Sequence, residues 1–266
     1  MTIIINMINF VCKLKRREMS NNNTMDNTSQ IELFQKYCSL LKKQDFDNAN
    51  TLFNEIDWFG LCKVDYLNVL RTVPVITEDL LLSIFCSRDS RGLWDFYIDN
   101  FILKVRIRRK MSPKVEAFGW KHVYQMDYPA RDDRFILVSI LSKYSLTDRM
   151  TNEELDYYNQ FPEEFTIYRG TNEEEFESKE FGVSWTPEQK VAEFFAFREE
   201  ELTSERSKRI VLAATVHKAD IVTCLLGRNE YEFIVAPERL LDIHVLLNQR
   251  TNLYDIYVDE VRHIRL

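Results

Sequence analysis

The sequence is poor in cysteine and in the residues that interrupt regular structure. Its 266 residues include only six glycines, six prolines and five cysteines. The cysteines are scattered and odd in number, without a Cys-x-x-Cys pair or a cluster with histidine, so the pattern predicts neither a disulfide framework nor a metal site. A reducing, cytoplasmic environment is the simpler interpretation.

A basic surplus is also missing. The formal net charge is -7 at pH 7, which disfavours a simple nucleic-acid coat protein because such proteins neutralise phosphates with excess Lys and Arg. The low Gly and Pro content and the 45% of hydrophobic residues are instead typical of a globular protein with much helix.

Long apolar runs are absent as well. No stretch reaches the roughly 20 apolar residues of a membrane span. Residues 1–12 are apolar, but the basic residues of 13–17 follow them, whereas a secretory signal has the opposite order. We therefore expect no membrane partner.

The N-terminal residues 1–29 are expected to be disordered, because Asn, Ser and Thr dominate from Met19 onward. Met19 is also an alternative start to Met1. The residues just before it, Arg16-Arg17-Glu18, could be encoded by a purine run that resembles a ribosome-binding site. The N-terminal mass of natively expressed protein would decide between the two starts.

Helical periodicity begins near residue 30, with apolar residues on one face of 33–41 and of 46–56. Residues 134–144 are strongly apolar and predict a buried helix. Three segments carry helix-start signals. In each, a Ser or Thr hydroxyl can cap the helix; it stands before an apolar run, before a proline, or three residues before a glutamate. The segments are Thr77, Ser112-Pro113, and Thr151 with Glu154. We interpret residues 30–160 as a helical domain.

The texture changes at Phe161-Pro162, where β-favouring runs begin. Pro187 is expected to start a helix among them. The predicted strands are 165–168, 182–186, 209–216, 221–226, 230–235, 240–247 and 253–258. Residues 161–266 therefore predict a small β-rich domain, and the chain as a whole an α+β protein.

Three of these strands carry polar motifs: Tyr168-Arg169-Gly170, Ser184-Trp185-Thr186 and Glu230-Tyr231-Glu232. Their order resembles the arginine–serine–glutamate class of mono-ADP-ribosyltransferases, the class of the clostridial binary toxins and their bacterial and phage relatives. That family has a Ser-Thr-Ser-type middle motif, so Trp185 departs from it. The resemblance covers roughly residues 165–247. It implies a mixed β-sandwich ADP-ribosyltransferase domain that uses NAD as co-substrate.

The chemistry of the family gives these residues roles by resemblance. Cleavage of the nicotinamide–ribose bond builds oxocarbenium-like charge on the ribose, which the Glu232 carboxylate would stabilise. Glu230, two residues earlier on the same strand face, would orient or deprotonate the acceptor. Ser184 would hold Glu232, and Thr186 would support the same strand.

The other residues would contact NAD or the acceptor. Arg169 would pair with the diphosphate, and Gly170 would let the nicotinamide amide reach backbone groups. The candidates for stacking on the nicotinamide ring are Tyr168, Trp185 and Phe194. The turn 227–229 carries the candidates for acceptor recognition, Arg228 and Asn229; a plain hairpin turn fits it equally well.

The favoured interpretation is a toxin-like intracellular transferase that modifies a protein side chain, with arginine as first guess because the family links Glu-x-Glu to arginine. The family's setting implies a role in toxin–antitoxin or antiviral defence systems, with an antitoxin or chaperone partner. Three alternatives stay open: transfer to RNA or DNA, simple NAD hydrolysis, and a non-catalytic interaction module of the same fold. The basic run 104–110 keeps nucleic acid open.

Overall fold

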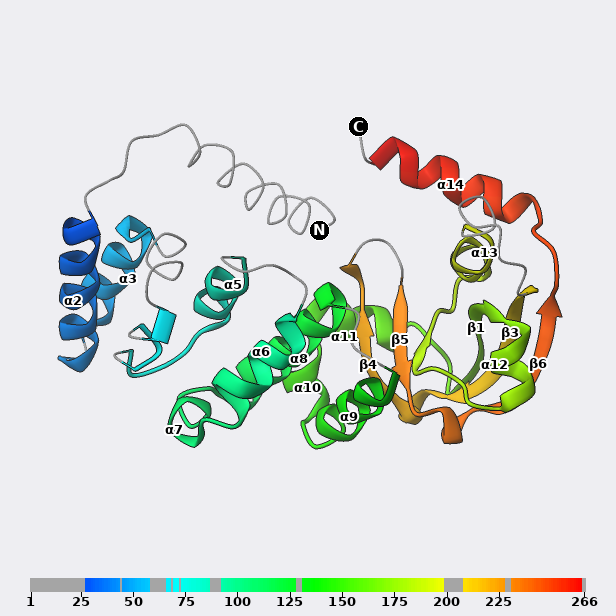
Figure 1. Ribbon diagram of the computed structural model, residues 1–266, viewed down its shortest axis with the longest axis horizontal. Coiled ribbons are helices and arrows are strands. Elements are labelled where there is room, and N and C mark those ends of the chain that lie inside the picture. The colour runs from blue at the N-terminus through cyan, green and yellow to red at the C-terminus, as the bar shows by residue number, and fades with distance from the viewer. Residues whose placement is uncertain are drawn as a thin grey trace. The chain divides into compact units, whose positions relative to one another are not determined.

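The computed structural model describes residues 27–43, 45–57, 66–67, 69–71, 73–86, 92–127, 131–198, 208–227 and 231–264. They belong to two compact units, which span residues 3–129 and 130–266. The first unit is helical and the second combines helices with two antiparallel sheets, so the α+β class is confirmed (Figure 1). No helix among the described residues is long and apolar enough to cross a membrane.

Helices make up most of the described part of the first unit. They are α2 (Asn27–Lys42), α3 (Phe46–Glu55), α5 (Glu78–Cys86), α6 (Leu93–Tyr97), α7 (Val105–Arg108) and α8 (Pro113–Asp127). Because α2 begins at Asn27, the last three residues of the segment expected to be disordered are helical; the rest of that segment lies outside the described residues. Helices α6 and α8 pack closely at Gly119, where an added Cβ would lie 2.3 Å from the Tyr97 hydroxyl.

The three helix-start signals are confirmed. The Thr77 hydroxyl accepts a hydrogen bond from the Leu80 amide at 3.3 Å, and the Ser112 hydroxyl accepts one from the Val115 amide at 3.3 Å. Thr151 forms a complete capping box with Glu154. Each bond satisfies an amide that the first helical turn leaves without a partner.

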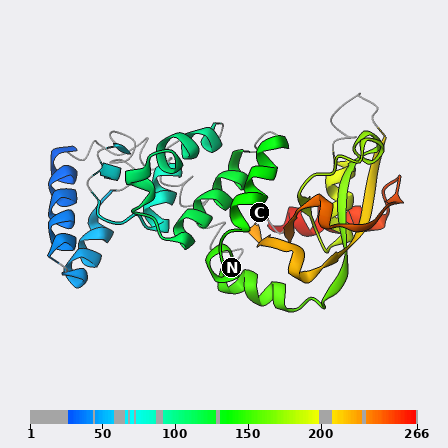
Figure 2. The same ribbon diagram turned by 90° about the horizontal axis from the view of Figure 1, so that it is seen from below.

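The second unit holds two three-stranded antiparallel sheets (Figures 1 and 2). Their orders are β1-β3-β6 and β2-β5-β4. The strands are β1 (Glu164–Asn172), β2 (Ser184–Trp185), β3 (Arg209–His217), β4 (Ile221–Leu225), β5 (Glu232–Val235) and β6 (Leu241–Leu247). The helices are α9 (Arg131–Leu141), α10 (Leu146–Arg149), α11 (Asn152–Asn159), α12 (Glu173–Ser178), α13 (Gln189–Phe197) and α14 (Asn252–Ile264).

Helices α9 to α11 belong with the sheets, although the expected domain boundary was 160/161. Helices α9 and α11 both contact β4. The Thr223 hydroxyl in β4 donates to the Arg149 carbonyl at 2.9 Å, and the Tyr158 hydroxyl donates to the Lys218 carbonyl at 3.1 Å. The compact unit therefore begins about thirty residues before the change in sequence texture.

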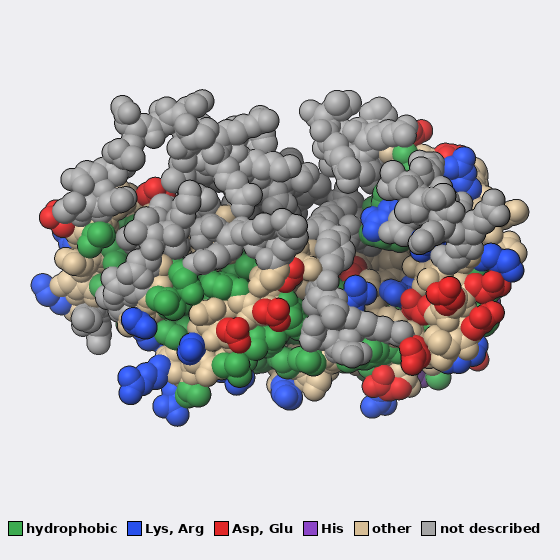
Figure 3. All heavy atoms as spheres, viewed as in Figure 1, with side chains coloured by type: hydrophobic (Ala, Val, Ile, Leu, Met, Phe, Trp, Pro, Cys, Tyr) green, Lys and Arg blue, Asp and Glu red, His purple; other side chains and the backbone are tan. Residues whose placement is uncertain are grey.

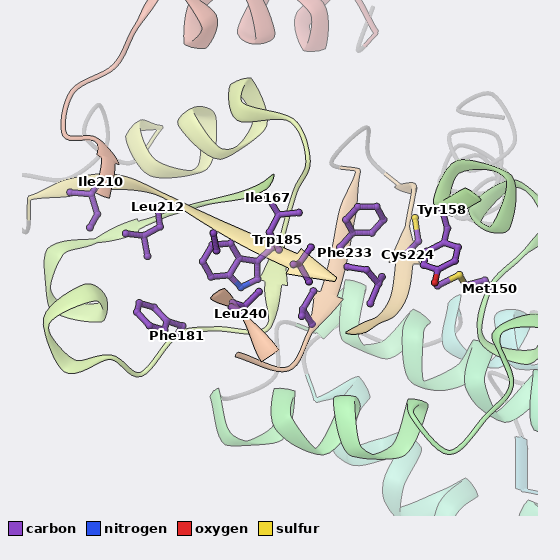
Figure 4. Close-up of a cluster of buried hydrophobic side chains, with 14 residues drawn as sticks. Met150, Tyr158, Ile167, Phe181, Trp185, Ile210, Leu212, Cys224, Phe233 and Leu240 are labelled. Carbon is purple, nitrogen blue, oxygen red and sulfur yellow. The ribbon is translucent and has the colours of Figure 1, made fainter. Parts of the chain in front are cut away.

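One hydrophobic core joins the two sheets to α10 and α11 (Figure 4). Ile167 and Leu212 reach it from the first sheet, Trp185 and Phe233 reach it from the second, and Tyr158 reaches it from α11. All five are less than 9% exposed. The shared core fixes where β1 and β2 lie relative to each other.

The prediction of a fully buried helix over 134–144 is wrong in part. The segment is helical up to Leu141, and Leu137 and Leu141 are buried. Phe135 and Ile136 are 38% and 43% exposed. Residues four apart share a helix face, so one stripe of α9 reaches the core while its neighbours face away.

The prediction of a strand at 253–258 is wrong, because this segment lies in α14. Tyr254 and Tyr257 are 4% and 3% exposed, whereas Ile256 is 45% exposed. A strand would instead bury Tyr254 and Ile256 together. Contact with α13 selects the helix, which overrides the β-propensity of the Tyr, Ile and Val side chains.

The hydroxyls of neighbouring residues Tyr157 and Tyr158 give the first test. The buried Tyr157 oxygen has no hydrogen-bond partner among the described residues, and burial raises the pKa of this side chain. Leaving a buried hydroxyl unsatisfied costs about 1–3 kcal/mol. Tyr157→Phe should therefore raise the free energy of unfolding by about 1 kcal/mol in urea titrations.

The matched control is Tyr158→Phe, which removes a hydroxyl that does donate a hydrogen bond. It should lower the free energy of unfolding by about 1 kcal/mol. Equal losses in both variants would contradict the assignment of Tyr157 as unsatisfied.

Candidate active site

Arg169 lies within β1, which continues to Asn172, whereas the predicted strand ended at Tyr168. Its guanidinium donates from Nε to Glu175 Oε1 at 2.7 Å and from Nη2 to Glu175 Oε2 at 3.2 Å. Nη1 donates to the Ser184 carbonyl oxygen at 2.8 Å. Three of its five N–H groups are thus used. One hydrogen on Nη1 and one on Nη2 have no acceptor among the residues that the structure describes.

Glu175 is the residue that anchors this guanidinium. Its carboxylate also accepts from the Thr171 hydroxyl at 2.6 Å and from the Gly182 amide at 2.8 Å. Burial alone would raise the pKa of Glu175, but the Arg169 charge and the hydrogen bonds from Arg169, Thr171 and Gly182 together hold the pKa below its ordinary value. Glu175 is therefore a carboxylate whose charge is balanced by Arg169.

Sequence reasoning missed Glu175. The only signal was a run of three acidic residues, 173–175, six positions or fewer after Arg169. Nothing in that run distinguishes the residue that turns inward. The Asn172 side chain caps α12 by accepting from the Glu175 amide at 3.0 Å, and this local geometry directs the third glutamate to the arginine.

The two glycines beside Arg169 allow close packing. A Cβ on Gly170 would lie 2.1 Å from the Ala192 carbonyl oxygen and 2.4 Å from the Ala196 amide nitrogen, both in the backbone of α13. A Cβ on Gly182 would lie 2.4 Å from Nη2 of Arg169. The absence of a side chain at Gly170 therefore serves helix–strand packing, which differs from the expected role of leaving room for a ligand.

The two sheets meet where Tyr168 and Thr186 exchange backbone hydrogen bonds of 2.7 and 2.8 Å. Because backbone groups alternate in direction along a strand, the N–H and C=O of Gly170 point to this same edge. Continuing the antiparallel register sets Gly170 opposite Ser184. The backbone of Gly170 thus faces the seam between the sheets, beside the guanidinium of Arg169.

The pairing of β2 with β5 orders the other motif residues. Ser184 pairs with Ile234 and Trp185 with Phe233. Paired residues share a face and successive residues alternate, so Trp185 and Phe233 enter the core. Ser184 and Glu232 consequently lie on the opposite face, and Thr186 lies on that face by continuation of the register. The strands bring three of the predicted polar residues together.

Glu232 is half-buried at the first position of β5. The residue before it, Tyr231, has a φ of 46°. A non-glycine residue in this left-handed region carries strain of about 1–3 kcal/mol, and such strain is concentrated at functional sites. The Tyr231 ring lies against Tyr157, with centroids 5.5 Å apart. The backbone therefore bends just before the candidate catalytic carboxylate.

Two aromatic candidates do not reach the seam. Trp185 is 1% exposed, and its indole nitrogen donates to the Gly182 carbonyl at 2.9 Å, so the prediction that it stacks on a ligand is wrong. Phe194 packs against Tyr254 and Tyr257 of α14, with centroids 6.1 and 5.2 Å apart. Tyr168 stays a candidate, since it is only half-buried.

Three candidates, Arg228, Asn229 and Glu230, lie outside the described residues. The predicted roles of Glu230 in catalysis and of Arg228 and Asn229 in acceptor recognition therefore stay predictions. Within the described part of the chain, no group of three or more His, Cys, Asp or Glu side chains is arranged to hold a metal ion.

Comparisons of the chain with protein-family models, with curated proteins and with solved structures give no significant match.

The two glycines give a graded test of this packing. Gly170→Ala forces a methyl group into helix backbone, which cannot move aside, and should lower the free energy of unfolding by about 3 kcal/mol or more. Gly182→Ala meets the Arg169 guanidinium, a side-chain end that can shift further than helix backbone, and should cost about 1–3 kcal/mol. Urea unfolding of both variants measures the difference; a larger loss for Gly182→Ala would contradict the packing described.

Proposed function

We propose that the second unit binds NAD and transfers its ADP-ribose group to an acceptor, in the manner of the arginine–serine–glutamate transferases. The observation that carries the proposal is that Ser184, Thr186 and Glu232 share one face of the second sheet. Arg169 alternates to the other face, that of Trp185, and its guanidinium reaches the seam by donating to the Ser184 carbonyl at the edge. These residues are far apart in the sequence and match the family's motifs in order.

The reaction needs a carboxylate where Glu232 lies. The bond between ribose C1′ and the nicotinamide nitrogen breaks, and nicotinamide leaves with the bonding electron pair as a neutral molecule. The ribose carries positive charge until the acceptor nitrogen or oxygen bonds to C1′ and loses a proton. A fixed negative charge beside the sugar lowers the energy of that cationic state. Glu230 is the proposed acceptor of the proton.

Arg169 suits the diphosphate of NAD. Its charge is balanced by Glu175, yet one N–H on Nη1 and one on Nη2 remain for an anion. Planar N–H pairs on a guanidinium bind phosphate oxygens in a bidentate manner. The backbone of Gly170, at the edge next to Arg169, offers an N–H and a C=O to the nicotinamide carboxamide.

The acceptor proposed first is an arginine side chain of another protein, and the proposed setting is a toxin-like enzyme controlled by an antitoxin or chaperone. The Glu-x-Glu pattern of residues 230–232 supports arginine, through the family resemblance. A guanidinium acceptor would also suit a site whose candidate catalytic residues are acidic.

Glu232→Gln tests the catalytic assignment. It keeps the size of the side chain and removes the negative charge, so transfer of label from NAD should fall about 10²–10³-fold. The measurement is incorporation of labelled ADP-ribose into macromolecules of a cell lysate, followed by digestion with protease or nuclease to identify the acceptor class.

The control for this change is Glu238→Gln, which removes an exposed carboxylate six residues further along the chain and should leave transfer unchanged. Full activity of Glu232→Gln would contradict the site. Release of free ADP-ribose without labelled macromolecules would indicate NAD hydrolysis, and no consumption of NAD would indicate a non-catalytic module.

Nucleic acid is the second candidate acceptor, and α7 is the observation that favours it. In the basic run 104–110, Arg108 pairs with Glu116 at 2.7 Å and Lys110 donates to the carbonyls of Leu70, Arg71 and Val73 at 2.7–2.8 Å. The remaining cations are exposed and have no side-chain partner in the described parts of the chain. They are Lys104, Arg106 and Arg109. Lys and Arg side chains gather at this end of the first unit (Figure 3).

Replacing Lys104, Arg106 and Arg109 together by Gln tests this candidate. Each phosphate contact with single-stranded RNA contributes about 0.7 to the slope of log affinity against log salt, so the wild type should show a slope of about -2 and the triple variant almost none. Fluorescence anisotropy with a labelled single-stranded RNA measures both slopes. Identical slopes would remove α7 as a nucleic-acid contact.

A further inference from the structure

Glu175 does more at the seam than balance the charge of Arg169, because it also binds two other groups. Its two oxygens accept four hydrogen bonds, two from Arg169, one from Thr171 and one from the Gly182 amide, at 2.6 to 3.2 Å. These donors come from β1 and from the segment that leads into β2. One carboxylate therefore ties the beginning of α12 to both edges of the seam.

The geometry points to Glu175 as a positioning residue of the NAD site: it holds the Arg169 guanidinium in the plane in which its two remaining N–H groups face the diphosphate. This inference rests on the proposed function. Glu175 does not touch the reacting atoms and acts only through Arg169.

The orientation of Arg169 is determined before any ligand binds. Arg169 and Glu175 are 15% and 16% exposed at their side chains, and Gly182 lies against Nη2 so closely that a Cβ would not fit. An arginine side chain otherwise loses up to about 2 kcal/mol of rotamer entropy on binding. Fixing it in advance removes that cost from NAD binding, which is the usual effect of preorganisation.

Glu175 also opposes NAD binding in one respect, because its negative charge reduces the attraction of Arg169 for a diphosphate. The two effects have opposite signs. If orientation dominates, loss of Glu175 weakens NAD binding; if charge dominates, loss of Glu175 strengthens it. Four directional hydrogen bonds on a mostly buried carboxylate favour orientation.

The experiment compares Glu175→Gln with the matched control Glu174→Gln, in steady-state kinetics of ADP-ribose transfer or NAD consumption. Glu174 is an exposed carboxylate on the same turn of α12. Glu175→Gln should raise KM for NAD about tenfold or more, with kcat changed less than about threefold. Glu174→Gln should leave both constants unchanged.

A double-mutant cycle with Arg169→Lys adds a second readout. If Glu175 acts through Arg169, the variant that carries both Arg169→Lys and Glu175→Gln should have no higher KM for NAD than Arg169→Lys alone. Should Glu175→Gln fail to fold, Glu175→Asp keeps the charge but withdraws the carboxylate by one methylene group, and KM should rise with it as well.

The outcomes separate the inference from the proposed function. An active wild type whose KM for NAD is unchanged or lowered in the folded Glu175 variant overturns the inference alone. Additive effects in the double-mutant cycle overturn it too. A wild type that neither transfers ADP-ribose nor consumes NAD overturns the proposed function, and the inference with it.

Discussion

At the seam where its two sheets separate, the second unit is held together by a largely buried ion pair between Arg169 and Glu175. The pair connects β1 to α12, and through the Ser184 carbonyl it connects β1 to β2. Removing one partner of a buried pair leaves an uncompensated charge, which typically destabilises a fold by about 3–5 kcal/mol. Stability and the proposed chemistry therefore share the same guanidinium, so selection on one constrains the other.

Local patterns in the sequence predicted local structure well. The hydroxyls of Ser112 and Thr151 act within one helical turn, so three residues of sequence contain the whole interaction. The β-favouring composition of each segment also predicts the strands β1 and β3. The family resemblance, and not the composition of either strand, predicts that Ser184 holds Glu232; the register of β2 with β5 puts the two side chains on the same face of the second sheet.

What sequence reasoning missed is determined by how segments of the chain pack against one another. The segment 253–258 has the composition of a strand, but α13 offers a surface that only a helix can match. Trp185 stands in the middle of a polar motif, yet the core between the sheets takes its ring. Glu175 could be told from its acidic neighbours only once Gly182 and Thr171 were known to converge on it. Such contacts between segments cannot be predicted from the spacing of residues in the sequence.

The contact at Gly170 has a mechanical consequence. Since not even a methyl group fits between β1 and α13, we expect the strand and the helix to move together. Helix α14 is attached to α13 by the Lys190–Glu260 ion pair of 2.8 Å. In addition, the buried Glu193 of α13 accepts hydrogen bonds from the amide and the hydroxyl of Thr251, the residue before α14. A displacement of α14 would thus be passed to the strand that carries Arg169, whereas β4 and β5 contact β1 through the bridge at Thr186 and through the shared core, where Phe165 packs against Phe233.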